Sequence, residues 1–225
     1  DTDTICTGTM GAFGGILAIL GVVVLFTTAQ EGGHGCTGCQ ILLNGIGTAG
    51  RAGISLAKNS DSNQLLFNNI GVWQGMAPLA DGIHLTEDSD ANLLDSNTVR
   101  HCGSDGLAIE DTSDGNLVVR NYLEYNLKDG LVIKFSFGNQ IGNGDSERNF
   151  IRWNANSGIA ITDNADSNTV TRNDVICNNQ SNGGFAGINH NFVSNDITKN
   201  TVQHTPIQIA IVPFVTGNTI SSCGQ

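Results

Sequence analysis

Positively charged residues are scarce in this sequence of 225 residues. It contains 10 Lys and Arg against 21 Asp and Glu, which gives a formal net charge of −11 at pH 7. Proteins that bind nucleic acids neutralise the phosphates with clustered Lys and Arg side chains. So few cations, scattered among the acids, argue against nucleic acid as a partner and also against an anionic membrane surface.

Charged residues of both signs and prolines are also few. The charged fraction is 14%, and there are only 3 prolines. In contrast, the chain has 29 glycines and 26 asparagines. Both residue types form helices poorly, glycine because of its backbone entropy and asparagine because its side chain competes for backbone groups. The composition therefore predicts a turn-rich, all-β protein of one or at most two domains.

Cysteine usage indicates where the protein works. The six cysteines are an even number, and the chain begins at Asp1 without an initiator methionine. We interpret it as an exported chain whose signal segment has been removed, located outside the cell or on its surface. A disulfide-bonded loop is favoured for Cys36 and Cys39, since a zinc site needs a second Cys or His pair. The disulfide candidates are Cys6, Cys36, Cys39, Cys102, Cys177 and Cys223, of which Cys6 and Cys223 are predicted to staple the two ends.

The composition changes near residue 45, because asparagine first appears at Asn44 and a cation at Arg51. We predict an apolar, Cys-containing N-terminal cap or assembly segment over residues 1–44 and a second domain over 45–225. Residues 10–26 contain no polar or charged side chain. They could be buried strands or a cap, a contact with another copy, or a membrane anchor, which needs about 20 apolar residues. The anchor is not favoured, since no Lys or Arg flanks the segment.

A repeated unit follows this change. A glycine followed by an aliphatic residue recurs at spacings of 24 to 29 residues. The glycines are Gly53, Gly82, Gly106, Gly130, Gly158 and Gly187. Apolar residues one and three places after the glycine alternate with others, as in strands with one face inward. A short strand pattern repeated at this length predicts a parallel β-solenoid of about seven to eight stacked coils.

Asparagine occupies two fixed places in four of these units. Ten residues after the glycine stand Asn63, Asn92, Asn116 and Asn168, and fifteen residues after it stand Asn68, Asn97, Asn121 and Asn173. Asparagine tolerates the left-handed backbone of tight turns. Stacked amides also bond one another along a column of strands. We therefore predict that these asparagines form a structural ladder.

Two consecutive units carry a family resemblance. The segments GIHLTEDSDANLLDSNTVRHC and GLAIEDTSDGNLVVRNYLEYN resemble the right-handed parallel β-helix repeats of the pectate-lyase-like superfamily, including its carbohydrate-binding and sugar-hydrolase modules. The resemblance covers roughly residues 40–220. It implies a right-handed, single-stranded parallel β-helix, with an extracellular polysaccharide as the partner. If the chain is an enzyme, it implies a polysaccharide lyase, epimerase or glycoside hydrolase.

Catalytic residues are harder to find. The unit beginning at residue 82 is the richest and offers His84, Asp95, Arg100 and His101. A base with an acidic partner could remove a proton next to a carboxylate. However, these residues fall at offsets that belong to different faces of a coil, so we assign no catalytic site and favour a non-enzyme. His34 lies in a Gly-His-Gly element similar to that of polygalacturonases, but the accompanying aspartates are absent and we interpret it as a surface turn.

A column of aspartates is the only candidate for a metal. Asp61, Asp90 and Asp114 share one offset in three successive coils. Their carboxylates could be bridged by Ca²⁺, which binds oxygen ligands. A solvated turn residue is the preferred interpretation, and no other cofactor is predicted.

Two functions remain open. The outward strip of Ser55, His84, Ala108, Val132 and Ala160 is small and mostly uncharged, which suits packing between copies. We therefore favour an exported structural protein that self-assembles into an extracellular filament, sheath or surface layer. The alternative is a polysaccharide-binding or polysaccharide-processing module. Rings that could stack on sugars are Trp73, Tyr122, Tyr125, Phe135, Phe137 and Trp153.

Overall fold

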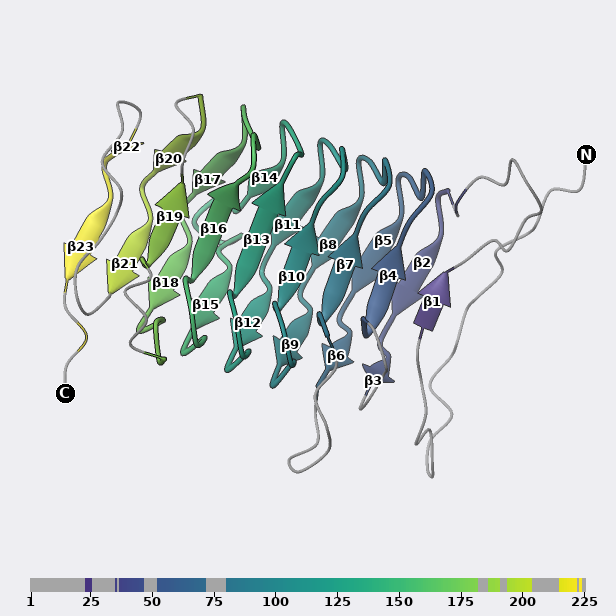
Figure 1. Ribbon diagram of the computed structural model, residues 1–225, viewed down its shortest axis with the longest axis horizontal. Helices are drawn as coiled ribbons and strands as arrows, with labels where there is room; N and C mark the ends of the chain where they lie inside the picture. The colour runs from purple at the N-terminus through teal and green to yellow at the C-terminus, as the bar shows by residue number, and fades with distance from the viewer. Residues whose placement is uncertain are drawn as a thin grey trace, which may run out of the picture.

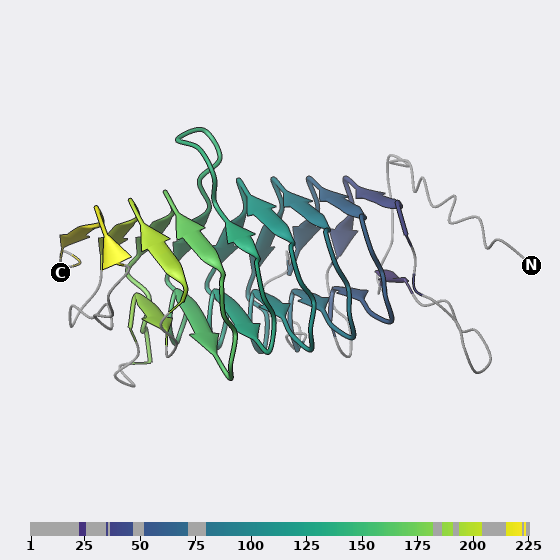
Figure 2. The same cartoon turned by 90° about the horizontal axis from the view of Figure 1, so that it is seen from above.

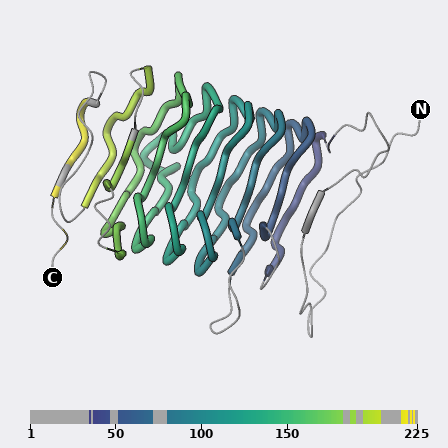
Figure 3. The backbone as a smooth tube through the Cα atoms, in the orientation of Figure 1, coloured from purple at the N-terminus to yellow at the C-terminus, as the bar shows by residue number. Residues whose placement is uncertain are grey.

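The structure is a computed structural model that describes residues 23–25, 35, 37–46, 52–71, 80–181, 186–190, 194–203, 215–221 and 223. All regular elements in these ranges are short β-strands, which follow one another in coils stacked in a single row (Figures 1 and 3). The strand pairs in these ranges are parallel, as in Leu107 of β10 beside Ile83 of β7. The predicted all-β parallel solenoid is therefore confirmed.

The strands form three sheets, one along each side of the solenoid. Sheet A has seven strands: β1 (Val23–Leu25), β4 (Ile54–Leu56), β7 (Ile83–Leu85), β10 (Leu107–Ile109), β13 (Leu131–Lys134), β16 (Ile159–Thr162) and β19 (Ile188–His190). Sheet B has eight: β2 (Gln40–Leu42), β5 (Gln64–Leu66), β8 (Leu93–Asp95), β11 (Leu117–Val119), β14 (Gln140–Ile141), β17 (Thr169–Thr171), β20 (Asp196–Thr198) and β22 (Val215–Thr216). Sheet C also has eight: β3 (Gly45–Ile46), β6 (Asn69–Ile70), β9 (Thr98–Arg100), β12 (Tyr122–Glu124), β15 (Phe150–Arg152), β18 (Asp174–Ile176), β21 (Thr201–Gln203) and β23 (Thr219–Ser221).

Equivalent residues of successive coils lie directly over one another. Leu107 pairs with Ile83 on one side and with Leu131 on the other, so the glycine anchors that precede these residues are in line. Strands β1 and β2 lie before residue 45 and already pair with β4 and β5. Coil strands thus begin ahead of the predicted boundary at residue 45, and the division into two domains stays a prediction.

The core is a column of aliphatic side chains inside the coils. Leu85, Ile109 and Ile133 are fully buried in it, each one residue beyond an outward position of sheet A. Ala108, Val132 and Ala160 form a separate buried cluster on the other side of the same sheet. These three residues are no more than 5% exposed in the single chain. They therefore leave little apolar surface for a second copy to cover.

Buried asparagine ladders connect the coils at their turns. Asn121 accepts hydrogen bonds from the backbone N–H and the side-chain Nδ2 of Asn97, and its own Nδ2 donates to Asn149 and to the Leu94 carbonyl. One ladder contains Asn44, Asn68, Asn97, Asn121, Asn149, Asn173, Asn200 and Asn218. A second contains Asn63, Asn92, Asn116, Asn139, Asn168 and Asn195. A buried N–H without an acceptor costs about 1–3 kcal/mol. The ladders avoid this cost, because their side-chain oxygens accept hydrogen bonds from backbone N–H groups in turns that water does not reach.

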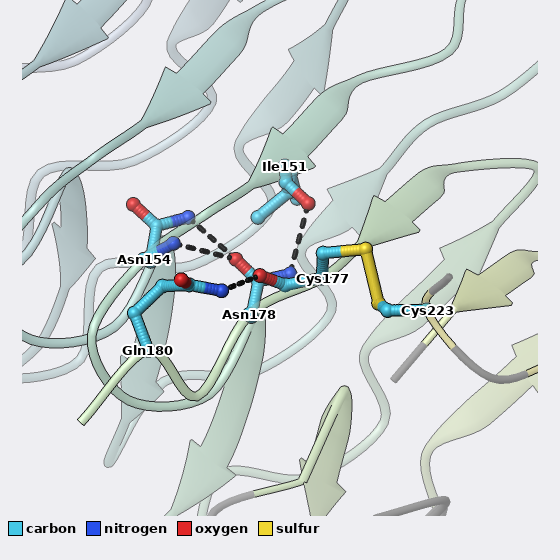
Figure 4. The surroundings of a disulfide bond; sticks show 6 residues. All are labelled: Ile151, Asn154, Cys177, Asn178, Gln180 and Cys223. Atoms are coloured by element: carbon cyan, nitrogen blue, oxygen red, sulfur yellow. Dashed lines mark hydrogen bonds between the residues drawn. A yellow bond between two sulfur atoms is a disulfide. The ribbon is translucent and has the colours of Figure 1, made fainter. Parts of the chain in front are cut away.

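The cysteines divide into bonded and free. Cys177 and Cys223 form a disulfide that ties the end of β18 to the C-terminal end, 46 residues away (Figure 4). Cys39 is also disulfide-bonded, whereas Cys6 and Cys36 lie outside the described residues.

Cys102 was predicted as a disulfide candidate, and this is wrong. It is a free, buried thiol. Its backbone N–H donates to Asn126, which places it at the start of a third column that continues through Asn154 and Asn178. Burial raises the pKa of the thiol to about 12, so the side chain stays protonated.

The apolar segment of residues 10–26 lies outside the described part of the chain, apart from β1. In the ranges that the structure does describe, no helix is long and apolar enough to span a membrane.

Candidate functional site

Titratable side chains from three coils meet on the outer face of sheet A. His84 points outward because Ile83 and Leu85 on either side of it are in the core. Glu110 follows β10 and Lys134 ends β13. Glu110 lies between two basic side chains, with its Oε1 2.8 Å from Lys134 Nζ and its Oε2 3.4 Å from His84 Nε2. Asp81 Oδ2 lies 3.8 Å from His84 Nδ1. We call Asp81, His84, Glu110 and Lys134 the Glu110 cluster.

The contacts in this cluster set its charges. Burial by itself lowers the pKa of His84, but the contact with Glu110 and the charge of Asp81 outweigh it and raise the pKa. His84 and Lys134 in turn lower the pKa of Glu110 to about 2, against the opposing effect of burial. Glu110 is therefore ionised throughout the physiological range, and the acids around His84 stabilise its protonated form.

Two further carboxyl groups lie beside the cluster in one column with Asp81. The backbone N–H of Asp105 donates to Asp81, that of Asp129 to Asp105, and that of Ser157 to Asp129. Burial, together with the neighbouring carboxylate of Asp105, raises the pKa of Asp129 to about 6. Burial also raises the pKa of Asp105. Asp129 can thus gain or lose a proton near neutral pH.

This arrangement has the components of an acid–base site. Two cations can neutralise an anionic group or a developing negative charge, and a carboxyl group with a pKa of about 6 can transfer protons. Perturbed pKa values gathered on one surface are typical of functional sites. The column of Asp81, Asp105 and Asp129 was not predicted, although the sequence carries a signal for it: each aspartate directly precedes an anchor glycine.

The other residues considered for catalysis lie away from this face. Asp95 ends β8 in sheet B and pairs with Arg120, with 2.5 Å between Oδ2 and Nη2. Arg100 and His101 lie at the end of β9 in sheet C, where the His101 ring stacks on Tyr125 at 5.4 Å. The structure therefore does not bring these three residues together with His84. His34 lies outside the described residues.

The aspartates considered for calcium make backbone contacts instead. The N–H of Asp90 donates to Asp61 and the N–H of Asp114 donates to Asp90. The Asp114 carboxylate accepts the N–H of Phe137. No group of three or more His, Cys, Asp or Glu in the described ranges is placed to hold a metal ion. This geometry gives no support to calcium at these residues.

Aromatic rings gather on the outer face of sheet C. Tyr122 and Phe150 stack at 4.9 Å, and Tyr125 and Trp153 stack at 5.0 Å. The Arg152 guanidinium lies 4.5 Å from the centre of the Trp153 ring. Three of the rings considered for sugar stacking are thus on one face, joined by Phe150. Phe135 and Phe137 follow β13 in another turn, and Trp73 lies outside the described residues.

Comparisons with solved structures find the same fold in mannuronan and alginate epimerases. The Azotobacter vinelandii mannuronan C-5 epimerase AlgE4 A-module matches with a TM-score of 0.66 at 14% identity, covering 83% of this chain and 54% of that chain. The AlgE6 A-module of the same organism matches with a TM-score of 0.64 at 13% identity, covering 84% and 59%. The periplasmic alginate epimerase AlgG matches with a TM-score of 0.65 at 16% identity, covering 84% and 48%.

These similarities are limited to the fold. The chain spans about half the length of the solved structures it matches. No curated protein sequence matches it. The family described as the right-handed β-helix region matches residues 35–175, which is more than half of the chain. With its three parallel sheets and stacked asparagines, the chain belongs to the right-handed β-helix family.

Proposed function

We propose that this chain is a polysaccharide-processing β-helix module whose acid–base site consists of the Glu110 cluster and Asp129. The observation that carries the proposal is the meeting of His84, Glu110 and Lys134, in contacts of 3.4 Å or less, on the outer face of sheet A. The solved structures of the same fold are epimerases of mannuronan and alginate, which supports a sugar polymer as the substrate class.

The side chains have distinct roles in this proposal. His84 and Lys134 hold positive charge against the sugar and stabilise negative charge that develops during the reaction. Glu110, with its pKa of about 2, keeps both cations in place. Asp129, with its pKa of about 6, accepts or returns the proton. The disulfide between Cys177 and Cys223 supports export from the reducing cytosol, so the polymer would be met outside the cell or at its surface.

The self-assembling structural protein has less support. That hypothesis depended on the small outward strip of sheet A, but Ala108, Val132 and Ala160 are already buried in one chain. Glu110 and Lys134 on the same face are charged, and charged groups lose hydration when copies pack together.

A polysaccharide panel tests the proposed function. The purified chain is incubated with neutral and uronic-acid polymers, and the products are followed by NMR for epimerisation, by absorbance for unsaturated sugars and by reducing ends for hydrolysis. We expect turnover of at least one polymer, with a loss of 100-fold or more in Glu110→Gln. The substitution removes the charge that positions His84 and Lys134, and losing one group that stabilises developing charge costs about 10²–10³-fold.

The matched control is Glu124→Gln, because Glu124 forms an equivalent ion pair with Arg152 on sheet C. Its activity should equal that of the unmodified chain. Full activity of Glu110→Gln, or no turnover of any polymer, would contradict the proposal.

A further inference from the structure

One loop forms a wall beside the aromatic face of sheet C. In the coil of β11 and β12, the turn between sheets B and C consists of Arg120 and Asn121 alone. In the next coil the same connection is residues 142–149, and it stands out from the row of coils (Figure 2). Ion pairs hold it on both sides, from Glu147 to Arg120 at 3.7 Å and from Asp145 to Arg172 at 3.0 Å. The loop is therefore tied to the coils before and after it.

An open groove lies between this loop and the sheet. Its volume is about 350 Å³, within the range of about 300–1,000 Å³ that is usual for small-ligand sites. It is lined by the rings of Tyr122 and Phe150, the hydroxyl groups of Ser96 and Thr98, and the guanidinium groups of Arg120 and Arg148. Residues 145 and 146 complete it from the loop. We call it the loop groove.

The neighbours of Tyr122 in its column differ greatly in size on the two sides of its ring. The Arg152 guanidinium also lies over this ring, 6.0 Å from its centre. In the column of paired strands, Tyr122 lies between Thr98 and Phe150. Phe150 stacks on it almost in parallel, at an interplanar angle of 12°. On the other side is the much smaller Thr98, and the Tyr122 residue is 38% exposed. An apolar ring face beside hydroxyl groups fits the C–H face of a sugar ring, whose own hydroxyls point outward around its edge.

The charges around the groove exclude an anion as the preferred ligand. Asp95 binds Arg120 through both carboxylate oxygens, and Asp174 lies 3.1 Å from Arg148. Three arginines (Arg120, Arg148 and Arg172) face four acids (Asp95, Asp145, Glu147 and Asp174), so the local charge is 3 − 4 = −1. The arginines are fixed and neutralised, yet each guanidinium carries five N–H donors, more than these pairs use. Such groups suit uncharged hydroxyls.

We propose that the loop groove binds a neutral sugar unit of an oligosaccharide or polysaccharide, with the ring stacked on Tyr122 above Thr98 and Ser96. The proposal rests on the proposed function for its class of ligand and adds a second sugar contact on a different sheet from the Glu110 cluster. Because the two sites are on different sheets, binding in the groove is separable from turnover.

Protein-observed NMR with short oligosaccharides tests this directly. The probes are neutral gluco-, manno- and xylo-oligosaccharides and, as the charged comparison, an oligomannuronate. We expect saturable shifts confined to residues 96–98, 120–122 and 142–150 with at least one neutral probe, and affinity that does not change with salt. Tyr122→Ala should weaken binding by 10-fold or more, and Thr98→Phe, which fills the stacking place, should abolish it while leaving the fold intact.

Tyr125→Ala is the matched control, because Tyr125 stacks in the other ring column, with Trp153. It should bind like the unmodified chain. Absence of shifts in the groove with every neutral probe, unchanged affinity in Tyr122→Ala and Thr98→Phe, or tighter and salt-sensitive binding of the oligomannuronate would each overturn the inference.

The two proposals fail in different ways. Groove binding that persists in Glu110→Gln, without turnover in any form of the chain, would remove the proposed function and leave the groove. Turnover that persists in Tyr122→Ala, with no groove shifts in the unmodified chain, would remove only the groove.

Discussion

At the scale of single residues, Glu110 determines the charge of sheet A's outer face. It contacts both His84 and Lys134, and each of these cations is half-buried. Because burial alone lowers the pKa of a histidine, the positive form of His84 depends on the acids beside it.

Removing the charge of Glu110 should therefore change the titration of His84. In Glu110→Gln we expect the His84 pKa to fall, since burial remains and the largest opposing contact is lost. The measurement is an NMR titration of the imidazole C–H signals. Glu124→Gln should leave the His84 pKa where it is, and an unchanged value in Glu110→Gln would show that the contact does not hold the proton.

Asp129 gives a second test, in which removing the charge should raise the stability of the folded chain. Its pKa of about 6 in the folded chain exceeds the ordinary value of 3.8, so folding binds a proton and stability falls as the pH rises from about 4 to about 6. Asp129→Asn keeps an oxygen for the Ser157 N–H but removes the buried charge. We expect it to raise the free energy of unfolding at pH 7 by about 1–3 kcal/mol and to flatten the pH dependence over that range.

Urea unfolding at pH 7 and pH 4.5 measures this effect. The control is Asp145→Asn, because Asp145 has an exposed side chain, at 80%. Its stability should change by less than about 0.5 kcal/mol at either pH. A destabilised Asp129→Asn at pH 7 would show that the charge is favourable where it stands.

At the scale of elements, the ladder positions should differ in importance according to their place. Asn121 lies in the middle of its ladder and is 1% exposed, whereas Asn44 begins the same ladder and is half-buried. Asn121→Ala leaves the Asn97 N–H and the Leu94 carbonyl without their partner, and we expect a loss of about 3 kcal/mol.

Asn44→Ala is the matched substitution, with an expected loss under about 1 kcal/mol. Both are measured by chemical denaturation. Equal losses of unfolding free energy at the two positions would mean that burial does not increase the contribution of a ladder asparagine to stability.

Substitutions at two glycines distinguish two reasons for having glycine, close packing between coils and a left-handed backbone conformation. A Cβ on Gly106 would lie 2.6 Å from the Gly130 carbonyl oxygen in the next coil. Gly115 has a φ of +63° with open space around it. We expect Gly106→Ala to cost about 3 kcal/mol or more because the coils must separate, and Gly115→Ala to cost about 1 kcal/mol for the left-handed backbone alone. Thermal unfolding of both variants measures the two losses of stability. A larger loss in Gly115→Ala than in Gly106→Ala would contradict the argument that the coils are closely stacked at Gly106.

The same elements show what the sequence could predict. The asparagine and glycine columns were predictable because each residue keeps its offset within the unit, and stacking converts an offset into a position in space. The Glu110 cluster was not predicted from the sequence, because Asp81, His84 and Glu110 occupy three different offsets. Their side chains come together only in the folded chain, on the outer face of sheet A. Only Glu110 and Lys134 share an offset, four residues after Gly106 and Gly130. The loop groove was not predicted, since the course of residues 142–149 depends on ion pairs with other coils.

At the scale of the whole molecule, each coil contacts mainly the coils beside it, so stability is distributed along the row. The C-terminal end has one covalent link, from Cys177 to Cys223. Closing a loop of this length is worth about 4 kcal/mol in the chain-entropy description.

Cys223→Ser should therefore loosen one end and not the centre. We expect faster hydrogen exchange in β22 and β23, with exchange in β10 and β13 unchanged. Cys102→Ser is the comparison, because it places a hydroxyl in a buried central position and should act on β9 and β12 instead. Uniform acceleration along the chain in Cys223→Ser would indicate that the solenoid unfolds as one unit.

The unbroken register between neighbouring coils also bears on how such a chain can change its length. Since Leu107 lies over Ile83 and under Leu131, a duplicated stretch of DNA encoding residues 82–105 would add a rung whose side chains meet the same partners above and below. Growth or shortening of the gene by whole rungs would leave both outer faces intact, and the distance between a groove and an acid–base site could evolve in fixed steps.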